Sequence, residues 1–381
     1  MKSPVLSLNV LLVALATVLG LAEPARAAAV AGTPDATASF DGAVRAIAYA
    51  GSTVYVGGDF TKAYSGGRTY PRSRLAAIDA RTGALLAWAP AADGRVRGLV
   101  ATGSSVFAIG DFGYVNGVRR DSLVRLRSSD GAVLSGFAHA INGVPHTIGA
   151  GNGRLYVGGS LTAVDGYPRS GLAAFDLSSG ALDGAWRPTA DATVQSLAVA
   201  PDRVYLSGDF QQINGVSGSA RLGAVDPANG GYDGSFRPEV RYVARGIAVS
   251  ADGVYAAHGG PGGRLVSYDF AGAARWTITT DGDGQAVAVL GDVVYLGGHF
   301  DNVCRSARTG NQGSCVDGSE RRVKIAAISP AGQLLDWAPQ ANGVEGVFAI
   351  ATTVDLWKVA IGGTFTTVGG ASRLRFAQFS S

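Results

Sequence analysis

The sequence predicts an all-β fold, a seven-bladed β-propeller built from four-stranded antiparallel blades. The first observation is a heptapeptide, VYVGGDF at Val54, which returns six times in altered form. The further copies begin at Val106, Leu155, Val204, Val254, Val294 and Val359. Successive copies start 52, 49, 49, 50, 40 and 65 residues apart, a period typical of propellers and other repeat arrays.

The second observation is the pattern within one repeat. Short apolar runs at residues 44–49, 54–60, 75–78 and 84–88 are separated by Gly, Asp, Asn and Ser clusters, which is typical of short strands joined by turns. Asp79 to Gly83 forms a tight-turn sequence in which glycine can supply a positive φ. Four antiparallel strands per repeat make one propeller blade.

The third observation is an aromatic residue at the end of the fourth run. This position is filled by Trp88, Phe137, Trp186, Phe236, Trp276 and Trp337. The seventh repeat lacks a fourth run, because the sequence given stops at Ser381 just after residues 374–379. We therefore expect residues 37–42, with Phe40 at the aromatic position, to complete the last blade. Such closure of the ring would remove the two open sheet edges.

The N-terminal residues predict an exported protein. Lys2, an apolar stretch from Val5 to Ala22 and the small residues Ala25 and Ala27 indicate a secretory signal peptide over 1–27. The alternative is a signal anchor. We expect a linker over 28–36 and the propeller over 37–381, with no later segment long enough to span a membrane. The sequence thus predicts a secreted, extracellular protein, which we expect to be a monomer.

The net charge argues against a nucleic-acid partner, and the two cysteines indicate a disulfide. Without the leader the chain carries a formal charge of +2, because Lys2, Arg26 and Glu23 leave with it. This balance gives no broad basic surface for nucleic acid. Cys304 and Cys315 are predicted to form a disulfide in an oxidising compartment. The alternative, a metal or redox pair, lacks Cys-x-x-Cys or histidine spacing.

The repeat unit has a recognisable consensus. VYVGGDF is followed by a glycine-containing loop, RSRLAAID from Arg72, TGAL from Thr82 and WAP from Trp88. This unit resembles the delta-60 type β-propeller repeat of exported bacterial proteins, from about Thr37 to Ser381. The resemblance implies the fold and an exported location. It implies no agreed activity and no catalytic motif.

A polar residue recurs near the start of the first run of every repeat, and a small residue follows it. The seven residues are Arg45, Arg97, His146, Gln195, Arg245, Gln285 and Glu345. The first strands of propeller blades line the central axis, so we expect a polar ring with about +2 of formal charge there. Our hypothesis is that this ring binds an anionic ligand, an acidic sugar or a cell-wall fragment. The alternative is a water-filled channel in which Glu345 pairs with Arg45.

Two other functions stay open. Gly-x-Ser-x-Gly, His-Glu-x-x-His and phosphate-loop motifs are absent from the sequence. One enzyme hypothesis is a polysaccharide lyase in which His146 is the general base and Arg45 and Arg97 neutralise a uronate; Glu345 is a second catalytic candidate. The other alternative is a protein-protein interaction platform that uses the loops and leaves the ring empty.

Several further residues receive a structural interpretation. We expect the motif aspartates Asp59, Asp111 and Asp209 to cap strand ends by accepting backbone N–H bonds. Recurring arginines are expected to bridge blades; they are Arg74, Arg221, Arg264 and Arg373. Asp281 and Asp283 resemble the start of a calcium loop, but the downstream ligands are missing and a glycine-rich turn is favoured. We expect no cofactor, with calcium as the alternative. The insertion over 302–324 is expected to rim the axial pocket.

Overall fold

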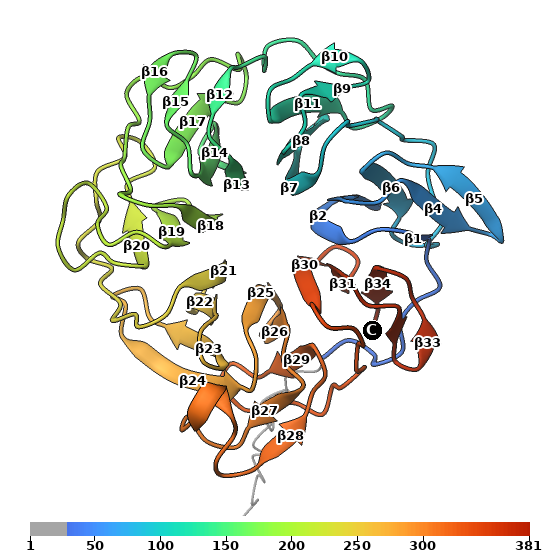
Figure 1. Cartoon of the computed structure of the whole chain (residues 1–381), viewed down its shortest axis with the longest axis vertical. Coiled ribbons are helices and arrows are strands. Elements are labelled where there is room, and N and C mark those ends of the chain that lie inside the picture. Colours follow the sequence, from blue (N-terminus) through green and yellow to red (C-terminus); the bar gives the residue numbers. More distant parts are fainter. Residues whose placement is uncertain (1–28) are drawn as a thin grey trace, which may run out of the picture.

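The computed structural model describes residues 29–381, and the predicted signal peptide over 1–27 lies outside these residues. The described part is all-β, with one 3₁₀ turn, Asn311–Gly313, and no α-helix. Three-stranded sheets and one six-stranded sheet are arranged around a common centre, with their strands stacked outward from it (Figure 1). None of the helical structure within 29–381 could cross a membrane.

The sheets repeat one topology, and we name each after its inner strand. In the β2 sheet, β2 (Val44–Ala50) pairs with β3 (Thr53–Gly58), which pairs with β6 (Leu75–Asp79), all antiparallel. The same order recurs in β7 (Val96–Thr102), β8 (Ser105–Gly110) and β11 (Leu123–Arg127); β13 (Pro145–Gly151), β14 (Arg154–Gly159) and β17 (Leu172–Asp176); β18 (Val194–Val199), β19 (Val204–Gly208) and β20 (Leu222–Val225); β21 (Ala244–Ser250), β22 (Gly253–His258) and β23 (Gly263–Tyr268); β25 (Gly284–Leu290), β26 (Val293–Gly298) and β29 (Ile325–Ile328); and β30 (Val347–Thr353), β31 (Lys358–Gly363) and β34 (Phe376–Phe379).

The expected fourth strands are mostly reduced to single bridges. Only the β21 sheet, among the described residues, has a full fourth strand, β24 (Ala274–Thr280). In the β2 sheet the outer segment joins through one pair, Ile78 with Leu85. The aromatic residue of this segment still fills its predicted place: Trp88 is buried against Tyr55 and donates its Nε1–H to the Arg127 carbonyl of the next sheet at 3.0 Å. The fourth position therefore serves mainly to join neighbouring sheets.

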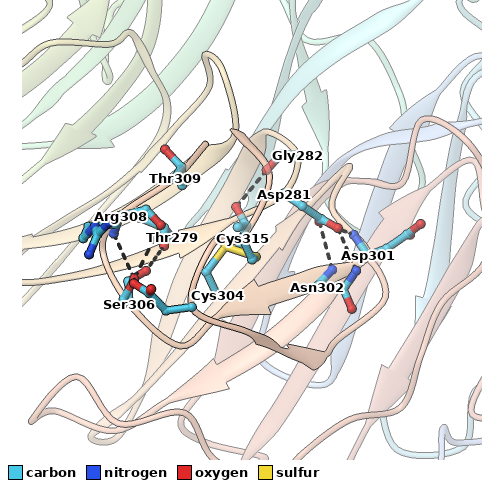
Figure 2. Close-up of a disulfide and its surroundings, with 12 residues drawn as sticks. Thr279, Asp281, Gly282, Asp301, Asn302, Cys304, Ser306, Arg308, Thr309 and Cys315 are labelled. Atoms are coloured by element: carbon cyan, nitrogen blue, oxygen red, sulfur yellow. Dashed lines mark hydrogen bonds between the residues drawn. A yellow bond between two sulfur atoms is a disulfide. The ribbon is translucent and has the colours of Figure 1, made fainter. Parts of the chain in front are cut away.

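In five of the seven sheets the loop after the second strand forms a small hairpin. These are β4 (Lys62–Ser65) with β5 (Arg68–Pro71), β9 (Tyr114–Val115) with β10 (Val118–Arg119), β15 (Ala163–Val164) with β16 (Tyr167–Pro168), β27 (Asn302–Cys304) with β28 (Ser319–Arg321), and β32 (Thr367–Val368) with β33 (Ala371–Ser372). Each lies outside the inner sheets, toward the rim in Figure 1. The predicted disulfide between Cys304 and Cys315 is confirmed and staples the longest of these connections (Figure 2).

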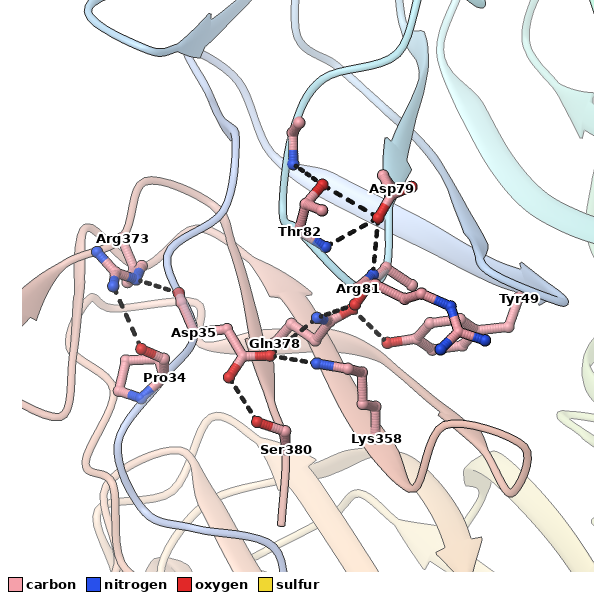
Figure 3. Close-up of polar contacts among 12 residues, drawn as sticks. Pro34, Asp35, Tyr49, Asp79, Arg81, Thr82, Lys358, Arg373, Gln378 and Ser380 are labelled. Carbon is pink, nitrogen blue, oxygen red and sulfur yellow. Dashed lines mark hydrogen bonds and ion pairs between the residues drawn. The ribbon is translucent and has the colours of Figure 1, made fainter.

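The beginning and the end of the described chain lie side by side. The Ala31 N–H donates to the Ser380 carbonyl at 2.8 Å and the Asp35 N–H to the Gln378 carbonyl at 2.7 Å. Arg373 donates to the carbonyls of Pro34 and Asp35 at 3.2 and 3.0 Å (Figure 3). The segment beside β34 is thus residues 31–35.

The prediction that Phe40 occupies the aromatic position of the last sheet is wrong. Phe40 belongs to β1 (Ser39–Phe40), which pairs with β4. Its ring packs against Phe60 at 4.4 Å and Phe376 at 6.4 Å between centroids. The aromatic side chain therefore fills the space between two sheets. A buried aromatic residue is expected at either strand position, so the sequence pattern did not determine the register of this segment.

Candidate functional site

Every inner strand carries a β-bulge at the same place. In β2, Val44 pairs with Gly58 and Ala46 with Gly57, so that Arg45 is the extra residue. The extra residues of the successive inner strands are Arg45, Arg97, His146, Gln195, Arg245, Gln285 and Phe348. A bulge bends the strand and redirects the side chain of the extra residue. The repeated bulge is therefore the backbone feature that gathers these side chains at one end of the axis.

Six of these seven side chains line a central cavity of about 220 Å³. Five of the predicted ring residues contribute to its wall together with Phe348; they are Arg45, Arg97, His146, Arg245 and Gln285. Gln195 lies in an adjacent hollow of about 320 Å³, which it shares with Asp209 and Arg245. The structure thus brings six of the seven predicted residues to one face of the propeller.

The placement of Glu345 in this ring is wrong. Val347 pairs with Gly363 as Val44 pairs with Gly58, so Phe348 holds the place that Arg45 holds in β2. Glu345 precedes β30 and is exposed. The expected pair of Glu345 with Arg45 is replaced by a cation–π contact, with the Arg45 guanidinium carbon 4.6 Å from the centre of the Phe348 ring.

The motif aspartates are partners of the ring residues, and the prediction that they cap strands is wrong. Asp59 accepts hydrogen bonds from Arg45 Nε at 2.7 Å and from Arg95 Nε at 2.6 Å. Partial burial raises the pKa of Asp59, but these two guanidiniums outweigh it and hold the pKa below its usual range. A carboxylate with two such partners stays ionised and fixes both guanidiniums.

The same pairing recurs in two further sheets. Asp111 accepts from both Nε and Nη2 of Arg97 at 2.7 and 2.9 Å. Asp209 accepts from the Gln195 side-chain amide at 2.9 Å. In all three sheets the two partners are separated by 14 residues, because each motif aspartate follows the second strand of the hairpin whose first strand carries the bulge.

The β21 sheet obtains its carboxylate from a neighbour. Gly259 stands where Asp59 stands in the first sheet, and a Cβ there would lie 2.8 Å from Arg245 Nε. Arg245 Nη2 instead lies 3.4 Å from an oxygen of Asp283, which also accepts the Gly260 N–H at 3.0 Å. Asp281 accepts the backbone N–H groups of Asp301 and Asn302 at 2.8 and 2.9 Å. Both aspartates of the calcium-like sequence are therefore engaged in loop and ring contacts.

These contacts offset the positive charge that the sequence predicts for the ring residues themselves, while Arg221 and Arg241 add further guanidiniums to the adjacent hollow. Four guanidiniums and four carboxylates belong to this polar cluster: Arg45, Arg95, Arg97 and Arg245 with Asp59, Asp111, Asp209 and Asp283. Arg95 and Phe348 were not expected at the site. The constant spacing of 14 residues between ring residue and motif aspartate was the sequence signal for these pairs.

Two side chains of the cavity, His146 and Gln285, can still form hydrogen bonds to a ligand or to water. Burial and the nearby Arg97 lower the pKa of His146, which favours a neutral imidazole. The side-chain oxygen of Gln285 is buried and has no hydrogen-bond partner among residues 29–381. A buried acceptor without a partner is costly unless water or a ligand donates to it. The cavity therefore holds an acceptor and a neutral imidazole beside paired charges.

Comparisons with known proteins establish the fold. No protein-family model matches the chain, and no curated protein matches it in sequence. The computationally designed protein Ika8 is 14% identical over 92% of this chain and 100% of its own, with a TM-score of 0.52. The WD40 β-propeller domain of Doa1 is 11% identical over 91% of this chain and 96% of its own, with a TM-score of 0.55. At such identities the likeness concerns fold alone, and the chain has a β-propeller fold.

Proposed function

We propose that this protein is a recognition protein that binds a polar ligand over the central axis, an acidic sugar or a cell-wall fragment. The observation that carries the proposal is the bulge repeated in every inner strand, which collects ring side chains in one cavity. A bulge unpairs part of the ladder. The bulge recurs at the same place in every inner strand and carries a long polar side chain in six of seven cases. This repetition favours a ring that contacts a ligand.

The chemistry of the cavity favours a saccharide over a bare anion. Paired arginines and aspartates present both donors and acceptors, which the hydroxyl groups of a sugar can satisfy. The unpartnered Gln285 oxygen can accept from one further hydroxyl. Phe348 adds an apolar patch beside Arg45. Because the four guanidiniums already have carboxylate partners or neighbours, an acidic group on the sugar would use only their remaining N–H donors.

The same proposal includes a seven-bladed ring closed by the N-terminal segment. In earlier sheets an arginine donates to the outer segment of its own sheet, as Arg72 does to the Leu86 carbonyl at 2.8 Å. In the last sheet Arg373 makes this contact to Pro34, at the other end of the described chain. Three predictions accompany the proposal: export to an oxidising compartment, membership of the delta-60 repeat proteins and a monomeric state. The disulfide supports the first of them.

Lyase activity receives less support than binding. The neutral imidazole favoured at His146 is the form that a general base requires. However, Arg97 already gives Nε and Nη2 to Asp111, and Arg45 gives Nε to Asp59. These guanidiniums are therefore poorly placed to neutralise a uronate, and Glu345 lies outside the ring.

A protein partner is the second candidate, and the hairpins favour it. Tyr114 and Tyr167 are 49% and 60% exposed on the β9–β10 and β15–β16 hairpins. Exposed aromatic side chains on adjacent hairpins are typical of protein-binding surfaces. Such a partner would bind the rim and leave the axial ring free.

Calorimetric titration with neutral and acidic oligosaccharides tests the axial site. Arg97→Lys keeps the charge but loses the two-pronged contact with Asp111, and we expect it to weaken sugar binding about tenfold. Arg127→Lys is the matched control, because Arg127 pairs with Asp130 at 2.7 Å on an exposed turn. Equal affinity in both variants, or binding that is lost only when Tyr114 and Tyr167 are replaced, would reject the axial site.

A further inference from the structure

The β21 sheet differs from the others in the very short connection between its second and third strands. Only residues 259–262 connect β22 to β23, whereas residues 59–74 connect β3 to β6 and include the β4–β5 hairpin. A cavity of about 310 Å³ lies at this sheet. We call it the β21 cavity; its wall includes Val240, Tyr242, His258, Arg264, Val266 and Tyr268. It shares no lining residue with the axial cavity of about 220 Å³, but Arg241 and Tyr242 also line the hollow that contains Gln195.

Three motif positions have changed together here. VYVGGDF has become VYAAHGG, so that His258, Gly259 and Gly260 replace the Gly, Asp and Phe of the first copy. The ring of Tyr242 takes the space of the lost phenylalanine, because a Cβ at Gly260 would lie 2.6 Å from its Cδ1. As a result, the side chains of Tyr242 and His258 lie where the first repeat has a buried phenylalanine and a glycine.

His258 and Tyr268 form a buried polar pair behind this ring. His258 Nδ1 lies 2.9 Å from the Tyr242 carbonyl, and the Tyr268 hydroxyl lies 3.3 Å from His258 Nε2. Burial lowers the pKa of His258 to about 4. The imidazole is then neutral at neutral pH, so Nδ1–H donates to the carbonyl and Nε2 accepts from the hydroxyl. The pair adds no charge to the cavity and holds Tyr242 in place.

Arg264 has no carboxylate partner among the described residues. Its guanidinium carbon lies 4.6 Å from the centre of the Tyr242 ring, and Nη2 is 3.5 Å from the Thr309 hydroxyl. Nη1 is buried and has no hydrogen-bond partner within the described chain. Arg241 also borders the β21 cavity, and no carboxylate of residues 29–381 forms an ion pair with either arginine. Glu239 is the one acidic residue in the wall of the β21 cavity. Unlike the axial ring, this cavity keeps an excess of positive charge.

The disulfide-bearing segment closes one side of the β21 cavity. Ala307 lies in its wall, and Thr309 contacts Arg264. The Ser306 carbonyl accepts the Thr279 hydroxyl of β24 at 2.6 Å, and the disulfide fixes the same loop (Figure 2). The expectation that this insertion rims the axial pocket is wrong, because no residue of 302–324 lines that pocket. A stapled loop gives a fixed wall, which suits a preformed small-molecule site.

We propose that the β21 cavity binds a small organic carboxylate, with its carboxylate group on Arg264 and its apolar part against Val240, Val266 and Ala274. An uncompensated, stacked guanidinium is a strong carboxylate ligand, because its planar donors match the two oxygens. The apolar wall distinguishes an organic acid from an inorganic oxyanion. The cavity volume is at the lower end of the range of small-molecule sites.

Calorimetric titration and thermal shift with acetate, butyrate, benzoate and inorganic phosphate test this site. We expect butyrate and benzoate to bind more tightly than acetate and phosphate, since only they reach the apolar wall. Arg264→Gln should weaken benzoate binding about tenfold or more. Phosphate binding as tight as benzoate binding would overturn the proposal, as would the absence of binding by every carboxylate in the series.

Three variants separate this site from misfolding and from the axial site. Arg125→Gln is the matched variant, because Arg125 also stacks on aromatic rings, 5.7 Å from Phe107, but in the β7 sheet; it should bind benzoate as the unaltered protein does. Ala307→Trp places a bulky ring at the exposed edge of the cavity and should block benzoate without disturbing the core. Arg97→Lys should leave benzoate binding unchanged. Loss of benzoate binding in Arg125→Gln, or full binding in Ala307→Trp, would refute the location.

Discussion

Asp35→Ala tests the contacts that join the two ends of the described chain. The Asp35 carboxylate accepts from Lys358 Nζ at 2.7 Å, from Gln378 Nε2 at 2.9 Å and from the Ser380 hydroxyl at 2.8 Å (Figure 3). The side chains of Asp35 and Lys358 are only 22% and 11% exposed. The substitution would leave the Lys358 ammonium buried without its counter-ion. We expect the free energy of unfolding to fall by about 2 to 4 kcal/mol.

Urea denaturation followed by tryptophan fluorescence measures this change. Arg127→Met is the control, since Arg127 and Asp130 are also 2.7 Å apart but are 48% and 53% exposed, and its cost should be about 0 to 1 kcal/mol. In a double-mutant cycle, Lys358→Met in the Asp35→Ala background should recover part of the loss. If Asp35→Ala costs no more than the exposed control, the N-terminal segment does not hold the last sheet.

The pH dependence of the same variant gives an independent check. Partial burial raises the pKa of Asp35, but the hydrogen bonds from Lys358, Gln378 and Ser380 outweigh it and the net pKa is lowered from 3.8. A carboxyl group whose pKa is lower in the folded state stabilises the fold above its unfolded pKa and loses this effect as the pH falls. The difference between the protein and Asp35→Ala should therefore be constant near neutral pH and shrink below about pH 4.

Two further predictions concern the motif itself. Gly58→Ala should lower the free energy of unfolding by about 2 kcal/mol or more, because its Cβ would lie 1.9 Å from the Ala43 carbonyl oxygen; Gly32→Ala, with no atom within 4 Å of its Cβ, should change the urea midpoint little. Burial lowers the pKa of His258 to about 4 from 6.5, so the unfolded chain binds more protons between these values. Stability should then fall by about 3 kcal/mol from pH 6.5 to pH 4, and an equally steep fall in His258→Gln would contradict the assignment.

The sequence predicts the propeller well because its signals are repeated. The heptapeptide places the second strand of every sheet. Five of the six aromatic residues at the fourth position are buried and Trp276 is half-buried; Trp186 is fully enclosed and donates its Nε1–H to the Asp226 carbonyl at 3.1 Å. A motif that must satisfy the same packing several times leaves little freedom in its interpretation. The disulfide follows from short spacing and the absence of other cysteines.

The errors arose where one residue type suits two local structures. Val344-Glu345-Gly346 matches the pattern of a valine, a polar residue and a small residue, yet β30 begins three residues later. The turn between β30 and β31 has four residues, whereas the turn between β2 and β3 has two, so Phe348 lies 16 residues before Thr364 and the constant spacing of 14 does not hold in this repeat. A separation of 19 residues between Glu345 and Thr364, against 14 in the other repeats, was the warning in the sequence.

The aspartates were misassigned because a carboxylate at a strand end can accept from the backbone or from a side chain. The position of a single aspartate does not distinguish these partners, since the choice depends on the bulge in the preceding strand; only the constant spacing of 14 residues to the ring residue indicates the pairing. In this protein Asp41 takes the capping role, accepting from the N–H groups of Thr61 and Lys62. Asp59 instead accepts hydrogen bonds from the side chains of Arg45 and Arg95.

The altered fifth repeat is better explained by selection for an opening than by decay. A decayed repeat would lose contacts without replacement, yet here each loss has a specific substitute: Asp283 serves Arg245, and Tyr242 fills the place of a phenylalanine. The following repeat also lends its disulfide loop as a wall, through the Thr279 contact with Ser306. These substitutes restore packing around the gap but leave Arg264 Nη1 without a hydrogen-bond partner among residues 29–381. Since an unsatisfied buried donor costs about 1 to 3 kcal/mol, its retention beside rebuilt surroundings is the feature that a bound carboxylate would explain.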